Sequence, residues 1–100
     1  MVISEPVKDF LLKHLPDHMP HKSGIEAVKA DELPCFDVSG HTLEGTKWDN
    51  SHAVVRARQK YMVGSHHERY SVFTFVRLSD NQLDHAAFHE WMADEQRQGD

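Results

Sequence analysis

The clearest hydrophobic pattern in the chain is an alternation through residues 53–63. Apolar side chains recur there at every second position, and the basic residues 56, 58 and 60 fall between them. A period of two predicts a β-strand with one buried and one solvated face. Residues 64–68 have the composition of a turn, so we expect 53–63 and 70–78 to pair as an antiparallel hairpin. The second strand is apolar on both faces, which predicts a place inside the sheet.

Helical periodicity marks both ends of the chain. Four apolar residues share one face of a predicted N-terminal helix, which Ser4 should cap and Pro16 should end: Val7, Phe10, Leu11 and Leu15. Near the other end, Ser79 and Gln82 have the spacing of a capping box, which predicts a second helix beginning at residue 80.

The segment between the first helix and the hairpin is less regular. Ser23 and Glu26 match another capping box and predict a short helix over 24–31, with a strand at 25–28 as the alternative. Cys35 to Val38 should form a short strand with the thiol buried among apolar neighbours. Residues 39–51 should be irregular, with Trp48 anchoring them to the body of the protein.

These elements predict a single α+β domain over residues 1–100. We expect an antiparallel sheet of three or four strands, with the N- and C-terminal helices packed on one face. The predicted core consists of nine residues: Phe10, Leu11, Leu15, Phe36, Val55, Phe73, Phe75, Phe88 and Trp91.

Composition narrows the class of protein. A single cysteine among 100 residues excludes a disulfide framework and a zinc site of the CxxC type. The N-terminus lacks the pattern of a signal peptide, and no apolar run approaches the roughly 18 residues of a membrane span. A cytoplasmic protein without a membrane partner is the expectation.

Charge is unevenly distributed along the chain. Residues 79–100 carry six acidic residues and one basic residue, which accounts for the whole net charge of −5. Residues 53–78 carry five basic residues and one acidic residue, a local +4. Nucleic acid is an unlikely partner, because duplex binding usually needs a basic domain. The candidate binding residues are Arg56, Arg58 and Lys60 on the strand and Asp84, Glu90 and Asp94 on the acidic helix.

Nine histidines are the most unusual feature of the composition. His85 and His89 are four residues apart on the last predicted helix, a spacing that suits two ligands of one zinc ion. Arg56, Arg58 and Lys60, with Tyr61 and His66 nearby, also resemble the residue types of a small ribonuclease. A small His-dependent metal-binding or RNA-cleaving enzyme is therefore the alternative hypothesis.

The leading hypothesis is a non-enzymatic protein-binding module that acts through its charged surface and needs no cofactor. Such a module could be an inhibitor, an immunity or antitoxin-like protein, or a small accessory protein of an assembly such as a phage particle. Its partner would be another protein, and the separation of charge also predicts a homodimer in which the acidic helix of one copy covers the basic strand of the other.

Overall fold

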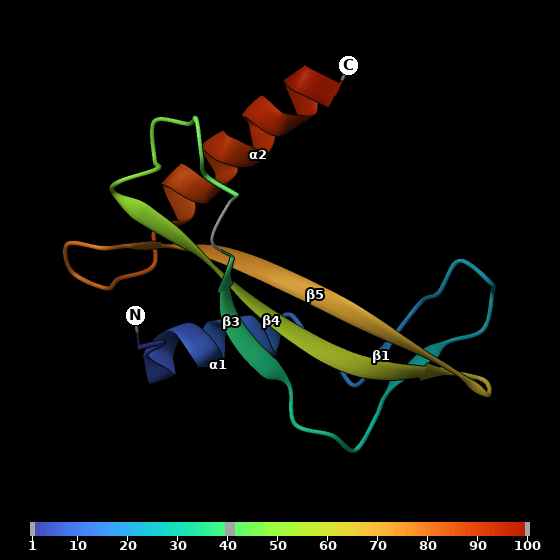
Figure 1. Cartoon of the computed structure of the whole chain (residues 1–100). Coiled ribbons are helices and arrows are strands. Elements are labelled where there is room, and N and C mark those ends of the chain that lie inside the picture. The colour runs from blue at the N-terminus through green and yellow to red at the C-terminus, as the bar shows by residue number, and fades with distance from the viewer. Residues whose placement is uncertain (1, 40–41, 100) are drawn as a thin grey trace.

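The computed structural model describes residues 2–39 and 42–99, and in this part of the chain two helices accompany a five-stranded antiparallel sheet (Figure 1). The predicted α+β class with N- and C-terminal helices is confirmed. The sheet exceeds the three or four predicted strands because two short segments also pair. The elements are α1 (Glu5–Lys13), β1 (His18–Met19), β2 (Ala27–Lys29), β3 (Cys35–Ser39), β4 (His52–Val63), β5 (His66–Arg77) and α2 (His85–Gly99).

Strand β4 organises the sheet. Along one side it pairs with β5 from Val63 opposite His66 to His52 opposite Arg77, which confirms the predicted hairpin. Along the other side it pairs with β3 at one end and β2 at the other, and β1 adds to β2. Only Gly64 and Ser65 connect β4 to β5, and the φ of Gly64 is 61°, as a two-residue type II′ turn requires.

The two helices pack on opposite faces of the hairpin, contrary to the prediction of a single covered face. Helix α1 places Val7 and Leu11 in a buried cluster with Val55, Ala57 and Tyr61, whose side chains share one face of β4. Helix α2 contributes to a second cluster on the other face. Hydrophobic residues on both faces of this end of the hairpin explain why each face takes a helix.

The second cluster joins α2 to the irregular segment before β4. Val54 and Phe75 are opposite one another on the sheet face that the first cluster does not use. Phe75 has ring contacts with Trp48, Phe88 and Trp91 at centroid distances of 5.9, 5.6 and 5.4 Å. The irregular segment was predicted over 39–51; Ser39 instead ends β3, and residues 40–41 lie outside the described residues. Trp48 is buried and anchors residues 42–51, as predicted for this segment.

Helix α2 begins later than the predicted capping box. Residues 82–84 instead extend beside the end of β5, where Leu83 forms a bridge with Val76. The N–H of Arg77 donates to Gln82 O and the N–H of Asp84 donates to Phe75 O. Asp84 is the residue that caps the helix, because its Oδ1 accepts the Ala87 N–H at 3.1 Å.

Other local predictions were also wrong. The helix expected over 24–31 is absent, and the alternative holds in part because β2 occupies 27–29. The Ser23 hydroxyl accepts the Ile25 N–H instead of capping a helix. Ser4 is at the N-cap position of α1 but its side chain makes no capping hydrogen bond. Cys35 is exposed, since it lies on the sheet face that α1 does not cover.

The predicted core is mostly correct. Leu11, Leu15, Val55 and Phe75 are buried, and four more of the nine residues are half-buried: Phe10, Phe36, Phe88 and Trp91. Phe73 is the exception, with 39% of its surface exposed. It shares a face with Phe75, but α2 covers only the end of that face.

Candidate protein-binding groove

The predicted basic binding residues are engaged within the chain. Both Asp37 oxygens accept bonds from the Arg56 guanidinium, each at 2.8 Å, and Arg58 lies 3.2 Å from the same carboxylate. The bond from Arg56 lowers the pKa of Asp37. Lys60 lies 3.9 Å from Glu32. The strand β3 and the segment before it therefore neutralise the cations that the sequence assigned to a partner.

The predicted acidic binding residues also have partners nearby. Glu90 pairs with Lys47 and Asp94 pairs with Arg97 one turn later on α2. Asp84 interacts with His52 and Arg77. Each of the six predicted binding residues, three basic and three acidic, therefore has an oppositely charged or hydrogen-bonding partner within the chain.

The structure does not bring together the residues of the predicted RNA-cleaving site. Tyr61 and His66 are on the face of the hairpin that α1 packs against, whereas Arg56, Arg58 and Lys60 are on the other face. His85 and His89 lie on the first turns of α2, beside the β5 edge. Over residues 2–39 and 42–99, no group of three or more histidine, cysteine or acidic side chains is arranged to hold a metal ion.

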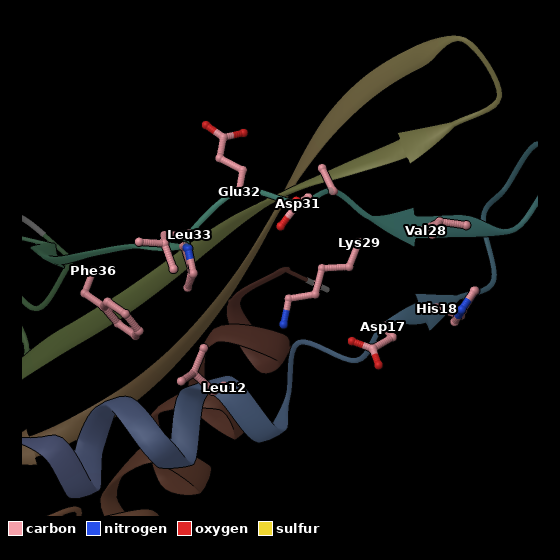
Figure 2. Close-up of a pocket in the computed structure, with 11 residues that line it drawn as sticks. Leu12, Asp17, His18, Val28, Lys29, Asp31, Glu32, Leu33 and Phe36 are labelled. Carbon is pink, nitrogen blue, oxygen red and sulfur yellow. The ribbon is translucent and has the colours of Figure 1, made fainter.

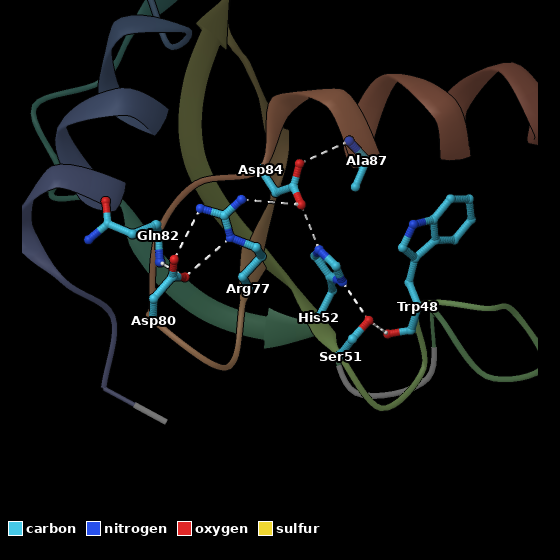
Figure 3. Close-up of polar contacts among 8 residues, drawn as sticks. All are labelled: Trp48, Ser51, His52, Arg77, Asp80, Gln82, Asp84 and Ala87. Carbon is cyan, nitrogen blue, oxygen red and sulfur yellow. Dashed lines mark hydrogen bonds and ion pairs between the residues drawn. The ribbon is translucent and has the colours of Figure 1, made fainter.

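A hydrogen-bonded chain of Ser51, His52 and Asp84 has the residue types of a hydrolytic triad (Figure 3). Ser51 Oγ lies 2.7 Å from His52 Nδ1, and His52 Nε2 lies 2.8 Å from Asp84 Oδ2. The Asp84 carboxylate has a structural role, since it also caps α2 and lies 3.9 Å from Arg77. This chain therefore ties the start of β4 to the start of α2.

Asp84 should accordingly stabilise the fold at neutral pH. The hydrogen bond with His52, then the Ala87 N–H and the charges of His52 and Arg77, lower the pKa of Asp84 below its ordinary value of 3.8. A lowered pKa means that stability is present above pH 3.8 and is lost as the pH falls through the folded-state value. We expect Asp84→Ala to cost about 2 kcal/mol at pH 7 in urea unfolding, because it removes a cap and a charged hydrogen bond. Asp84→Asn, which can still cap, should cost less, and equal losses would contradict a role for the cap, whereas an asparagine variant as stable as the unmodified protein would contradict a role for the charge.

One hollow is formed by the end of α1, β2 and the segment that leads to β3 (Figure 2). It has a volume of about 850 Å³ and combines apolar residues such as Leu12 and Phe36 with Asp17, Lys29 and Glu32. Leu33 on its rim is 89% exposed. Charges of both signs surround an open surface here, so the hollow selects no particular ligand chemistry.

A second candidate binding surface is the open edge of strand β5. The bonds of Phe75 and Arg77 to residues 82–84 show that odd-numbered residues of β5 direct their backbone groups away from β4. His67, Arg69, Ser71 and Phe73 continue this alternation, and in the described part of the chain no strand pairs with them on that side. The predicted interior position of β5 was therefore wrong: β4 is the interior strand.

A groove of about 620 Å³ runs along this edge between the two helices. Residues 71–74 of β5 form its floor, Phe10 of α1 and His14, which caps the end of α1, form one wall, and α2 contributes His85, Phe88 and His89 to the other. The lining is mainly apolar, with imidazoles at both walls. A strand-shaped ligand could satisfy the backbone groups of Ser71 and Phe73 and bury apolar side chains at once.

One buried polar atom in this groove lacks a partner. Thr74 is 1% exposed and lines the groove, yet its Oγ1 has no hydrogen-bond partner among the described residues. An unmade hydrogen bond at a buried hydroxyl costs about 1–3 kcal/mol. Such an orphaned group on the wall of a groove points to a ligand that supplies the missing partner.

No pattern in the sequence predicted this groove directly. The spacing of His85 and His89 predicted only metal ligands, and no local spacing marked His14. Ser71, Phe73 and Thr74 resembled ordinary strand residues, because the open edge arises only from the order of the strands.

Comparisons with protein families, curated proteins and solved structures found no match to this chain. Among the described residues, neither helix combines the length and apolar character that crossing a bilayer requires. The architecture and its groove define this protein as a small α+β protein with an open sheet edge between two helices.

Proposed function

We propose that this protein is a non-enzymatic protein-binding module that receives an extended segment of another protein along the open edge of β5. The observation that carries the proposal is the row of outward-facing backbone groups from His67 to Phe73, bordered by the groove. Addition of a strand to a sheet edge supplies affinity through the main chain and specificity through pockets for alternate side chains. The charged surface predicted from the sequence is a weaker candidate, because its charges pair within the chain.

The groove and the strand differ in chemistry along their length. At the helix end, Phe10, Phe88 and Phe73 offer apolar contacts. Toward the hairpin tip, Arg69 is exposed and has no ion-pair partner in the described part of the chain. The complementary segment carries apolar side chains where it lies between the helices and an acidic side chain opposite Arg69.

A second copy of this chain is a poorer occupant of the same edge. Antiparallel pairing of two β5 edges with Arg69 opposite Arg69 would place like charges directly across from each other. Shifting the two strands toward Phe73 would drive the Gly64–Ser65 tip of one copy against residues 82–84 of the other. The homodimer predicted from charge separation stays a prediction, and sedimentation at low and high salt tests it.

Exposure of the Cys35 thiol supports a cytoplasmic location, because free surface thiols persist in reducing compartments.

Ser71→Pro tests strand addition directly. The Ser71 N–H faces away from β4, so proline at this edge position removes a donor from the groove without removing a bond to β4. We expect the variant to remain folded by circular dichroism but to lose the peptides that the unmodified protein enriches from a displayed library of random heptapeptides. Ser71→Ala keeps the N–H and should enrich the same peptides. Equal enrichment by the proline variant would exclude the β5 edge as the binding site.

A further inference from the structure

The groove along β5 is closed at one end. Residues 82–84 already occupy the edge beside Phe75 and Arg77 through two backbone hydrogen bonds. A segment that adds to the edge at Ser71 and Phe73 therefore cannot continue along the sheet past Phe75. It must either turn out of the groove or end there.

The closed end carries hydrogen-bond donors of the kind that bind an anion. The orphaned Thr74 hydroxyl is one. His14 follows the last residue of α1 and His85 is the first residue of α2, and each ring lies 4.7 Å from the Phe10 ring between centroids. Imidazole nitrogens donate hydrogen bonds, and the positive end of the α2 dipole lies at His85.

Asp84, which precedes His85 in the chain, turns its carboxylate toward other partners. Asp84 directs its oxygens to His52, Arg77 and the Ala87 N–H, so its charge is balanced within the chain. An incoming negative charge would meet the donors of Thr74, His14 and His85 without a competing free carboxylate on Asp84.

From this juxtaposition we infer that the segment received by β5 ends in the groove, with its C-terminal carboxylate bound by Thr74, His14 and His85. The inference rests on the strand addition proposed above and specifies its ligand as a protein C-terminus. With the carboxylate at Thr74 and the acidic side chain near Arg69, the segment runs parallel to β5. Its carboxylate supplies the acceptor that the Thr74 hydroxyl lacks.

Two display libraries separate this inference from the proposed function. One presents random heptapeptides with a free C-terminus, and the other presents the same heptapeptides followed by a Gly-Ser tail. We expect the protein to enrich peptides from the first library only. Enrichment from both would overturn the C-terminal inference while supporting strand addition, and enrichment from neither would count against the proposed function itself.

Thr74→Val then tests the hydroxyl. Valine removes an unpartnered buried hydroxyl at nearly constant shape, so the melting temperature of the free protein should be unchanged or higher. Affinity for an enriched free-terminus peptide should fall about tenfold or more in calorimetry, as expected for loss of a charged hydrogen bond. Amidation of the peptide should weaken binding to the unmodified protein by a similar factor and add little to the valine variant. Thr74→Ser keeps the hydroxyl and should retain affinity, and undiminished binding by Thr74→Val would overturn the inference.

Discussion

Replacing Phe75 by alanine should lower the free energy of unfolding by about 3–5 kcal/mol, the usual range for a large aromatic side chain in a core. Phe75 is fully buried, and its ring contacts the rings of Trp48, Phe88 and Trp91. Its loss removes the surface to which both α2 and residues 42–51 attach. Denaturant unfolding followed by tryptophan fluorescence measures the change, and Phe75→Leu should cost less.

The loss of stability in the Phe75→Ala variant should also differ between the two faces of the hairpin. Helix α1 and the first cluster lie on the opposite face of the hairpin and make no use of Phe75. We therefore expect hydrogen exchange to accelerate first in residues 85–97 of the alanine variant, with α1 still protected. Uniform acceleration over both helices would show that the two clusters unfold as one unit.

Tyr61→Ala should have an effect of similar size, about 3–5 kcal/mol, on the other face. Tyr61 is fully buried in the first cluster, its ring meets Tyr70 edge-on at 5.0 Å, and its hydroxyl donates to Pro16 O at 2.6 Å. That bond fixes the chain where it leaves α1 for β1. Tyr61→Phe keeps the ring and should cost only about 1 kcal/mol for the lost hydrogen bond. Equal losses in the two variants would mean that the ring contributes little.

Alkaline pH provides an independent check on Tyr61. Burial, with smaller contributions from Asp17 and Tyr70, raises the pKa of Tyr61 above its ordinary value of 10. The unfolded chain then loses its proton first, so stability is present below pH 10 and falls as the pH rises through the folded-state value. Tyr61→Phe should lose less stability at alkaline pH than the unmodified protein does. Part of the loss should remain, because the pKa of Tyr70 is also raised.

Local patterns predicted the parts of the fold that depend on near neighbours. The hairpin followed from the alternation in 53–63, and α1 followed from one apolar face ended by Pro16. Predictions failed where a segment outside the local pattern competes for the same residues. The capping box predicted at Ser79 does not form, because residues 82–84 make backbone hydrogen bonds with the end of β5. Asp84 caps the helix instead.

The candidate site was beyond prediction for a related reason. A strand that is apolar on both faces normally lies inside a sheet, but in β5 the two faces are covered by two different helices near Phe75 while one edge stays open. Neither the register of the strands nor the sheet face that each helix covers follows from a local spacing of residues. The groove depends on both.

The central position of β4 has a consequence for how the protein is made. Strands β2, β3 and β5 pair with β4, and β1 pairs with β2. The face on which α1 packs also belongs to the β4–β5 hairpin. During synthesis, residues 1–51 therefore leave the ribosome before the surface they pack on exists. Domains generally fold as units, and nascent segments with exposed apolar surface are prone to aggregate. We expect nascent chains that are stalled before residue 63 to bind chaperones, and chains that are stalled after the full hairpin has emerged to resist protease.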